Sequence, residues 1–561
     1  MKKIFTHITN KCKQYTNRIF YTCANNNLLL SYTMLFNAMY ALDQFIANKL
    51  KNDEPYITIV SENILFKSIV FLYCFFTSTK LIMLSPKFST GEIVNTILSR
   101  RGINILFIDK EMLSNIENFE EEEGINITNF FNYIETTIKM LEIILDNKHE
   151  QSVSQLTTMI KKGRRKILTN PFPTHISILS PGTTFEPCIT NVSYNTLGKS
   201  MLALSYFMGL KPGNKVSVIA DFEFYPGMYT ILGLLNGIQF VLPEKDTSMY
   251  SGEELKDMIN KTDHKPEVIF ISSNNFKKVW DTILLKVYSN KLLFMLSKYL
   301  LTKWIVNKIL LREILTMFGK QVQKVHILNE ELGFFVLDIL KKSKIMFTSS
   351  YGFLEEGNFL AFKDPEVFKH KNFIYKPGGT LLKDNENFFN KVFINLEQGF
   401  ISTSKLEVGE ICVNVNEDEE DIKYIPSDDL GMLIPNIPNQ GDRKFLFVYG
   451  KSARHKEDDI YLEDQASLDL IERSLKDNWL IRDCFLQRNW ENNTDPTYNL
   501  FVEIREDLLD VRHISWEEIE STVRIMAMEL DKNSSTRIDG YAILKFNGMR
   551  NIADKLQYYN M

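Results

Sequence analysis

Short runs of β-branched and other apolar residues alternate with longer apolar segments along much of the chain, and this alternation restricts the possible folds more than any other feature. Near the N-terminus, the runs Tyr56–Val60, Leu81–Leu84 and Ile103–Ile108 are separated by helical patterns that begin near Ile64 and Gly91. Strands that alternate with helices form a parallel sheet that helices cover. The sequence therefore predicts an α/β fold built on parallel or mixed sheets.

The alternation resumes further along the chain and then changes character. Strand patterns at Ile176–Leu179, Val216–Ala220, Phe240–Leu242 and Glu267–Ile271 are separated by helical patterns that include Tyr194–Met208 and Gly227–Leu235. Beyond these, the segments become shorter and glycines occur at turns. The runs Val392–Ile394, Glu410–Val415 and Phe445–Val448 predict an antiparallel β region there.

The length of the chain and a late change of pattern predict two domains. The chain has 561 residues, whereas single hydrophobic cores stop growing near about 250–300 residues. The stretch beyond Gly450 has its own mixed α/β pattern and the size of a small independent domain. We therefore expect a large N-terminal domain at residues 1–449 and a small mobile C-terminal domain at residues 450–561.

Composition and spacing argue against several classes of protein. A net charge of −5 over this length gives no electrostatic reason to expect nucleic acid as a partner. The six cysteines form no CxxC pair and no HExxH occurs, so neither a disulfide framework nor a zinc site is expected, and a cytoplasmic location is the simplest. The apolar stretch Ile64–Phe76 is shorter than the ~20 residues that span a bilayer, which predicts a buried helix.

The tripeptide Gly198-Lys199-Ser200 is similar to the end of a Walker A loop. The glycine that such a loop requires five residues earlier is Ser193 here. The tripeptide also lies inside a helical pattern, whereas a Walker A loop joins a strand to a helix. We therefore do not expect phosphate binding at this position.

A more informative loop lies within Ile176–Cys188, where small hydroxyl residues and a glycine directly follow a strand pattern. Backbone N–H groups and hydroxyls in such a loop can surround phosphate oxygens. The loop resembles the pattern [ST]-[SG]-G-[ST]-T-G-x-P-K of the adenylate-forming superfamily, which includes acyl-CoA synthetases and peptide-synthetase adenylation domains. The residues that match are Gly182, Thr183, Thr184 and Pro187.

Two further motifs resemble this superfamily in the same order along the chain. Its Y-G-x-T-E motif packs the tyrosine and glycine against adenine and holds magnesium through the glutamate; the matching residues are Tyr351, Gly352 and Glu355. Its T-G-D-x-G motif binds both ribose hydroxyls through the aspartate, and Asp429 matches that residue. The resemblance thus implies that Gly182, Thr183 and Thr184 bind phosphate and that Glu355 is both a catalytic residue and the magnesium ligand.

The C-terminal part carries two partial matches. The superfamily hinge G-R-x-x-D resembles Gly450–Arg454, where Lys451 replaces the arginine and the aspartate is absent. Ala542–Lys545 resembles the P-T-L-K segment of long-chain acyl-CoA synthetases, whose lysine reaches into the site during adenylation. Lys545 is therefore the candidate catalytic cation. A solvated surface lysine is the alternative interpretation.

The resemblance extends from about Leu30 to the C-terminus and is closest to the long-chain branch. It implies a divergent AMP-forming acid–thiol ligase that joins a fatty acid to coenzyme A through an acyl-adenylate, using ATP and Mg²⁺. Phe185 stands where the loop has a second glycine, and Cys188 where it has a lysine. Losing one well-placed stabilising group commonly costs ~10²–10³ in rate. The alternative is thus a catalytically impaired relative that binds acyl groups or nucleotide, or serves as a scaffold, and loading an acyl group onto a carrier protein also stays open.

The segment Trp280–Phe318 is almost entirely helical in pattern, and cations are spaced among its apolar residues. These cations are Lys286, Lys291, Lys298, Lys303, Lys308 and Arg312. The pattern is typical of a helix that lies in the interface of an anionic membrane, so peripheral membrane contact through residues 280–318 is one interpretation. Core helices whose lysines face solvent give the same pattern, and both interpretations stay open.

Overall fold

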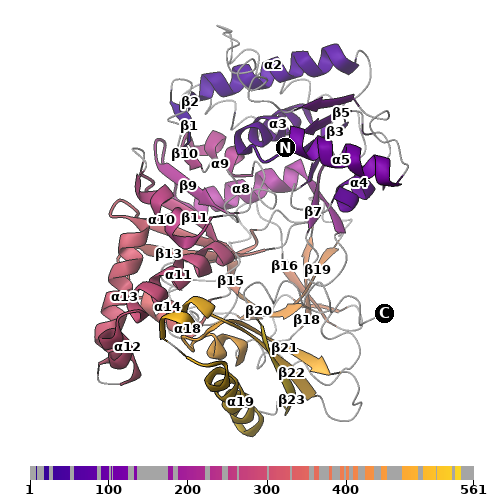
Figure 1. The fold of residues 1–561 in the computed structure, drawn as a ribbon. Helices are drawn as coiled ribbons and strands as arrows, with labels where there is room; N and C mark the ends of the chain where they lie inside the picture. Colours follow the sequence, from indigo (N-terminus) through magenta and orange to yellow (C-terminus); the bar gives the residue numbers. More distant parts are fainter. Residues whose placement is uncertain are drawn as a thin grey trace.

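A computed structural model gives the structure of the chain. It describes residue 8, residue 103 and residues 18–23, 29–50, 56–84, 90–99, 105–123, 132–135, 175–180, 188–220, 228–242, 250–261, 265–299, 302–328, 332–352, 359–364, 378–381, 392–396, 400–402, 409–414, 424–434, 444–451, 471–489, 497–512, 514–533 and 537–544. These residues form three sheets with helices packed on them (Figure 1).

The first sheet lies in the N-terminal part and is parallel except at one edge. Its strand order is β6 (Asn132–Glu135), β5 (Ile105–Ile108), β3 (Tyr56–Val60), β4 (Lys80–Leu84), β7 (His175–Ser180) and β8 (Cys188–Ser193). Only the β7–β8 pair is antiparallel among these described strands. One face packs on α3 (Ile64–Thr77), and the other packs on α4 (Thr90–Ser99) and α5 (Lys110–Glu123). Because both faces are covered, the central strands β3, β4 and β5 consist mostly of apolar residues, as the sequence predicts.

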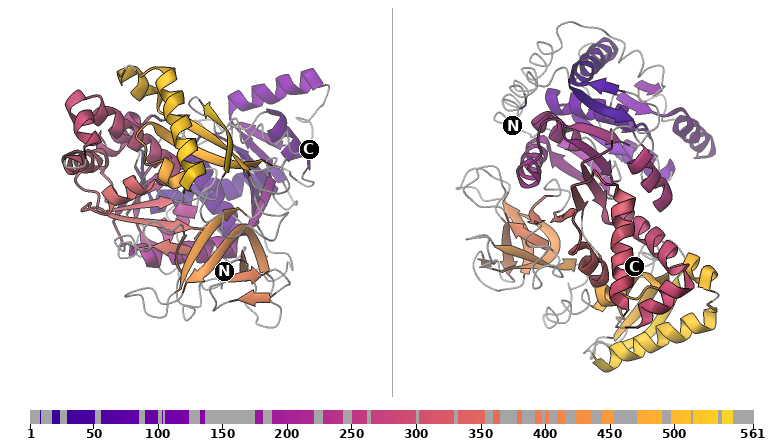
Figure 2. Two further views of the ribbon diagram at one scale, coloured as in Figure 1. Left: turned by 90° about the horizontal axis from the view of Figure 1, so that it is seen from below. Right: turned by 90° about the vertical axis from the view of Figure 1, so that its left-hand side faces the viewer.

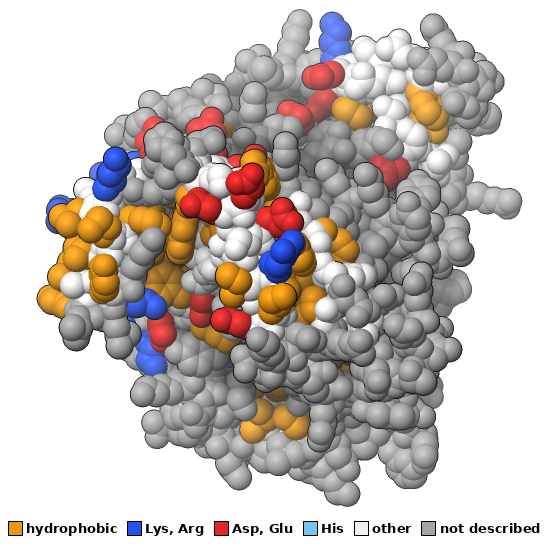
Figure 3. All heavy atoms as spheres, turned by 60° about the horizontal axis from the view of Figure 1, so that its bottom comes forward, with side chains coloured by type: hydrophobic (Ala, Val, Ile, Leu, Met, Phe, Trp, Pro, Cys, Tyr) orange, Lys and Arg blue, Asp and Glu red, His pale blue; other side chains and the backbone are white. Residues whose placement is uncertain are grey.

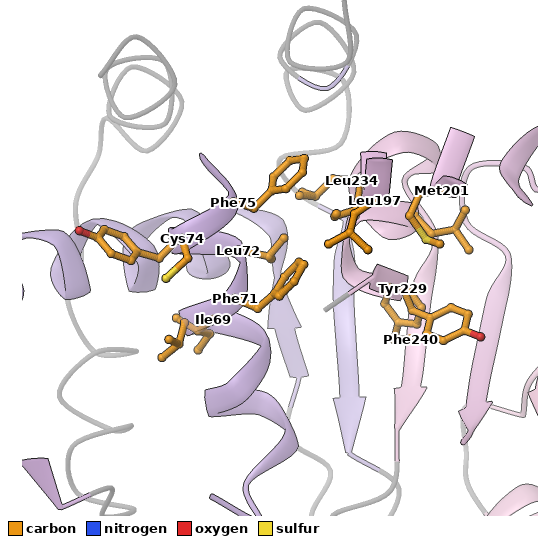
Figure 4. Packing of buried hydrophobic residues seen from close by; sticks show 14 of the residues in the cluster. Ile69, Phe71, Leu72, Cys74, Phe75, Leu197, Met201, Tyr229, Leu234 and Phe240 are labelled. Carbon is orange, nitrogen blue, oxygen red and sulfur yellow. The ribbon is translucent and has the colours of Figure 1, made fainter. Parts of the chain in front are cut away.

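Helix α3 is buried along its whole length, which confirms the prediction of a buried helix. The side chain of Asn63 begins the helix by accepting the N–H of Phe66, and Ser78 ends it in the left-handed conformation at φ 53°. In Figure 4, Phe71, Leu72 and Phe75 of α3 face labelled side chains of α8 (Tyr194–Met208), α9 (Met228–Asn236) and β10 (Gln239–Leu242). Among the described residues, no helix is long and apolar enough to cross a membrane.

The second sheet joins a parallel half to an antiparallel half. The parallel half contains β1 (Ile19–Cys23), β10, β9 (Lys215–Ile219), β11 (Val268–Ser272), β12 (Lys324–Leu328) and β13 (Met346–Tyr351), with β2 (Leu29–Ser31) at its edge. The antiparallel half contains β14 (Ala361–Lys363), β15 (Gly378–Leu381), β20 (Phe445–Lys451), β19 (Tyr424–Ile434), β18 (Gly409–Asn414), β16 (Val392–Leu396) and β17 (Phe400–Ser402). The predicted antiparallel β region is therefore confirmed.

Helices cover both faces of the parallel half. One face shares a core with α2 (Tyr32–Leu50), α3, α8 and α9, and this core also includes residues of the first sheet. The other face packs on α10 (Gly252–Lys261), α11 (Ser273–Tyr288), α13 (Lys303–Phe318) and α14 (Phe334–Leu340). The predicted helical stretch 280–318 is thus α11, α12 (Lys291–Lys298) and α13, which are separated at Asn290 and near Thr302. Gly198 lies within α8, as expected for a residue outside any phosphate loop.

The C-terminal elements form a third sheet with its own core. Strands β21 (Ile481–Asn489), β22 (Thr497–Ile504) and β23 (Arg537–Leu544) pack on α19 (Trp516–Asn533), and α18 (Glu506–Arg512) follows β22. Figure 2 shows these elements beside the helices that follow β11. Leu508 of α18 is buried in the same apolar cluster as α11, and Trp479 packs edge-on against Phe294 at 4.9 Å between ring centroids.

Candidate nucleotide-binding site

The candidate site begins at the carboxyl end of β13. Ligands of open parallel sheets bind outside the carboxyl ends of the strands, and β13 is the last parallel strand before the antiparallel half. Tyr351 is the final residue of β13 and Gly352 follows it directly. Tyr351 is the register partner of Ala361 in β14, and its carbonyl accepts the N–H of Leu360, the residue before β14, at 2.9 Å. This places the half-buried Tyr351 ring where the two halves of the sheet meet.

Asp429 approaches Tyr351 from β19, in the antiparallel half. The hydroxyl of Tyr351 donates a hydrogen bond to Oδ2 of Asp429 at 2.6 Å. The backbone N–H of Asp429 donates to Oγ of Ser427 at 3.1 Å, and Asp429 is only 7% exposed. Burial, and then the Asp429 carboxylate beside it, raise the pKa of Tyr351 well above its usual value. The phenol therefore stays protonated and donates to the carboxylate.

Lys451 lies opposite Asp429 in the sheet. The two residues are register partners across the antiparallel pair β19–β20, so their backbones are neighbours. The structure thus brings together three of the residues that the sequence motifs single out: Tyr351, Asp429 and, through its backbone, Lys451. Gly352 is next to them in the chain.

The remaining candidates lie outside the described residues: Gly182, Thr183, Thr184, Glu355 and Lys545. Elements that flank them are described. The loop with Gly182, Thr183 and Thr184 connects β7 to β8, whose backbones pair up to Ser180 and Cys188. Lys545 directly follows β23, which is parallel to β22.

A buried histidine next to this region was not singled out by the sequence. His326 lies on β12 and is fully buried; its Nδ1 is 2.8 Å from Oγ1 of Thr348, and its Nε2 is 3.0 Å from Oγ of Ser350. Burial lowers the pKa of His326 to about 3, so the ring is neutral at ordinary pH. One nitrogen of a neutral imidazole donates and the other accepts, and a hydroxyl can partner either. Alternate β13 residues, Thr348 and Ser350, thus hold the imidazole from both sides.

With this geometry described, the chain can be compared with known proteins. Family models and curated proteins give no match. Solved structures do match. One is the anthranilate CoA ligase AuaEII in complex with anthranoyl-AMP, with a TM-score of 0.66 and 10% identity over 99% of this chain and 97% of that chain. Another is a benzoate CoA ligase from Burkholderia xenovorans LB400, with a TM-score of 0.65 and 10% identity over 96% of both chains. A third is the o-succinylbenzoate CoA synthetase MenE from Bacillus subtilis with ATP and magnesium, with a TM-score of 0.63 and 14% identity over 96% of this chain and 95% of that chain.

Similarity at these identities establishes the fold. The chain has the fold of the adenylate-forming acid–CoA ligases, an α/β fold with a large N-terminal and a small C-terminal domain. The predicted fold class is therefore confirmed along nearly the whole chain. The matched ligases act on aromatic acids according to their names, so a fatty acid and the long-chain branch stay predictions.

Proposed function

We propose that this chain is an AMP-forming ligase that activates a carboxylic acid with ATP and passes the acyl group to a thiol. In the first half-reaction, a carboxylate oxygen attacks the α-phosphorus of ATP, and the bond to the pyrophosphate oxygen breaks. In the second, a thiolate attacks the acyl carbon of the adenylate, and AMP leaves. A fatty acid as substrate and coenzyme A as the thiol are the finer parts of this proposal, and they depend on the motif resemblance.

The observation that carries the proposal is the contact between Tyr351 and Asp429. A carboxylate accepts hydrogen bonds, and ribose hydroxyls donate them. Asp429 is held in place by β19, by Ser427 and by Tyr351, so its orientation needs little reorganisation on binding. The Tyr351 ring offers an aromatic face on which a purine can stack. These residues fit an adenosine, and the matched MenE structure with ATP shows that a protein of this fold holds that ligand.

The parts that handle phosphate are proposed from the sequence motifs. The backbone N–H groups and hydroxyls of Gly182, Thr183 and Thr184 would hold the phosphate oxygens. Glu355 would hold magnesium, which, when bound, neutralises charge on the phosphates. Lys545 would place its ammonium group near the attacked phosphorus. A boundary between residues 449 and 450 belongs to this proposal, because it assigns Lys545 to the smaller domain.

A binding protein without turnover is the second candidate, and a specific observation favours it. One carboxylate oxygen of Asp429 already accepts a short hydrogen bond from Tyr351, whose raised pKa keeps that donor in place. Together with Phe185 in the loop after β7 and Cys188 at the start of β8, this would permit nucleotide binding with negligible turnover.

Magnesium-dependent ATP–pyrophosphate exchange decides between the two candidates. The full chain is assayed with straight-chain fatty acids and with aromatic acids, because the matched ligases take the latter. Exchange with any acid supports the ligase. Binding of ATP or an acid by calorimetry, without exchange, supports the binding protein and overturns the ligase.

The placement of the nucleotide is tested separately. Asp429→Ala is expected to abolish measurable ATP binding in calorimetry, because ribose hydroxyls would then lose a buried acceptor. Glu253→Ala, on the exposed end of α10, is the matched carboxylate control and should bind ATP like the wild type. Equal ATP affinities of the two variants would remove Asp429 from the site.

A further inference from the structure

Exposed apolar side chains gather on the described surface around α12. Large hydrophobic residues with high exposure include Leu292 at 62%, Met295 at 55%, Tyr299 at 64% and Trp304 at 56%. All four lie on α12, in the turn after it and in the first turn of α13. We call these four residues the apolar tip. In Figure 3, orange side chains gather at the left-hand edge, on the side where Figure 1 places α12 and α13.

The exposure of the apolar tip follows from the way α12 packs. Asn290 begins α12 by accepting the N–H groups of Leu292 and Leu293. Leu293, Phe294 and Leu296 pack against the core that α11 and α13 share. Leu292 and Met295 are three residues apart, so they share a helix face, and that face is left outside the core. The opposite face of α12 is thus already packed against the protein's own core.

Helix α13 repeats this division. Its buried residues Val306, Leu310 and Ile314 recur every four residues and face the core. Trp304 lies on the exposed side, and Nζ of Lys308 stands 4.6 Å from the centre of its ring. The indole is therefore held in a defined position at the surface with a cation beside it.

The segment that carries the apolar tip has charged residues of one sign. Between residues 286 and 312 the chain contains Lys286, Lys291, Lys298, Lys303, Lys308 and Arg312, and no aspartate or glutamate. The whole chain has a net charge of −5, so this positive segment stands against the general trend. Lys291, Lys303, Lys308 and Arg312 are exposed. Lys286 forms an ion pair with Glu313 at 2.5 Å.

We propose that the apolar tip and its lysines dock on the surface of an anionic phospholipid bilayer. Leucine and methionine side chains would enter the boundary of the acyl chains, while the amphipathic rings of Tyr299 and Trp304 would lie at the headgroups. Lysines beside them would meet the anionic headgroups. An exposed apolar face on a segment whose charged residues are all cations matches this surface both in its apolar character and in its charge.

Another exposed apolar group lies on α19, but the residues around it in the sequence are mainly acidic. Trp516, Ile525 and Met528 are exposed at 49%, 53% and 56%. The same helix carries Glu517, Glu518, Glu520 and Glu529. Anionic headgroups would repel this helix, so it provides a matched control within the chain.

Vesicle co-sedimentation of the full chain tests the proposal. Phosphatidylcholine vesicles with and without about 30% phosphatidylglycerol are compared at low and high salt. The wild type is expected to sediment with the anionic vesicles and to be released by salt. The triple variant Leu292→Ser/Met295→Ser/Trp304→Ser should lose binding by at least about tenfold, and so should Lys291→Glu/Lys308→Glu. The control Trp516→Ser/Ile525→Ser/Met528→Ser should bind like the wild type.

Three results would overturn the proposal. The first is equal sedimentation of the wild type with neutral and anionic vesicles. The second is a loss of binding in the α19 control as large as in the variants of the apolar tip, provided that thermal unfolding shows all variants folded. The third is binding to poly-glutamate but to neither kind of vesicle, which would indicate an acidic protein partner.

Discussion

Replacing Asp281 by alanine is expected to loosen the C-terminal elements from α11. Oδ1 of Asp281 accepts from Nε of Arg505 at 2.7 Å, and its Oδ2 accepts from Nε of Arg482 at 3.0 Å. The side chains of Arg505 and Asp281 are 7% and 20% exposed. A neighbouring carboxylate, Asp483, joins Lys277 of α11 to Lys476 at 3.1 and 2.7 Å. Ion pairs therefore connect α11 to residues some two hundred positions later in the chain.

The free-energy cost of Asp281→Ala follows from these contacts. Removing one partner of a buried ion pair costs about 3–5 kcal/mol, because the other charge is left uncompensated. Arg505 would still donate to the carbonyl oxygens of Asn478, Trp479 and Ile481, and Arg482 would keep Glu503 at 3.6 Å. Since water also reaches Asp281, we expect a smaller cost of about 2–3 kcal/mol. That corresponds to an increase of about 30- to 140-fold in the population of the opened state.

The loss of stability should be confined to the C-terminal elements and α11. The aromatic contact between Trp479 and Phe294 would remain, and the cores of the N-terminal sheets do not involve Asp281. Hydrogen exchange is therefore expected to accelerate in residues 471–512 and in α11, with little change in β3, β4 and β5. Limited proteolysis should become faster at the proposed domain junction, residues 450–458. Glu253→Ala removes an exposed ion pair with Lys256 and should change stability by less than about 1 kcal/mol.

The reasoning would be refuted if the Asp281 and Glu253 variants exchanged at the same rates in residues 471–512. Uniform acceleration across all peptides would refute the local part of it. A first proteolytic cut within residues 195–245 would contradict the proposed division of the chain into two domains.

Three further variants test the site and its surroundings. Lys545→Ala should reduce pyrophosphate exchange by about 10²-fold or more with ATP affinity nearly intact, and unchanged exchange would remove Lys545 from the catalytic site. Burial raises the pKa of Asp477 to about 6, so the free energy of unfolding falls as the pH rises from about 4 to 6. Asp477→Asn keeps an acceptor for the N–H of Phe335. In urea titrations this variant should be more stable than the wild type by about 1–2 kcal/mol near pH 7 and equally stable near pH 4. Burial lowers the pKa of His326, so the neutral ring contributes fully to the free energy of unfolding above about pH 6.5. That contribution falls by up to about 1.4 kcal/mol per pH unit toward pH 3. His326→Gln should flatten this decline, and an unchanged pH profile of stability would contradict a neutral buried ring.

The N-terminal helices and strands could be predicted closely because each sequence pattern there fits only one type of secondary structure. The run predicted at Leu81–Leu84 is β4 at Lys80–Leu84, and the helix predicted at Tyr194–Met208 is α8 with the same bounds. Continuous apolar strands must be covered on both faces, so helices have to pack on each side of the sheet. Local periodicity thus determined this part of the architecture.

Contacts between polar residues far apart in the chain could be predicted only where a motif preserved the residue types. Tyr351 and Asp429 were found through such motifs, although 78 positions separate them. His326 was missed because the strand Lys324–Leu328 reads as an apolar run with one histidine, and its hydroxyl partners lie on the next strand. The ion pair of Asp281 with Arg505 spans 224 positions. No local pattern encodes such pairings, since they depend on how the third sheet docks.

The residues that make this fold and those that would carry its chemistry meet different physical demands. Strands β7 and β8 pair through their backbones as far as Ser180 and Cys188, and this pairing requires no particular side chain in the loop between them. Phe185 and Cys188 can therefore replace a glycine and a lysine of the superfamily pattern without loss of the sheet. The same replacements remove a close backbone approach and a positive charge that phosphate binding would use. A fold retained at 10–14% identity follows from the cores, which these positions do not build. Pyrophosphate exchange must therefore decide whether the chain is active. Exchange by the wild type tests whether the altered loop still supports adenylation. Lys545→Ala tests whether Lys545 supplies the positive charge that the loop has lost.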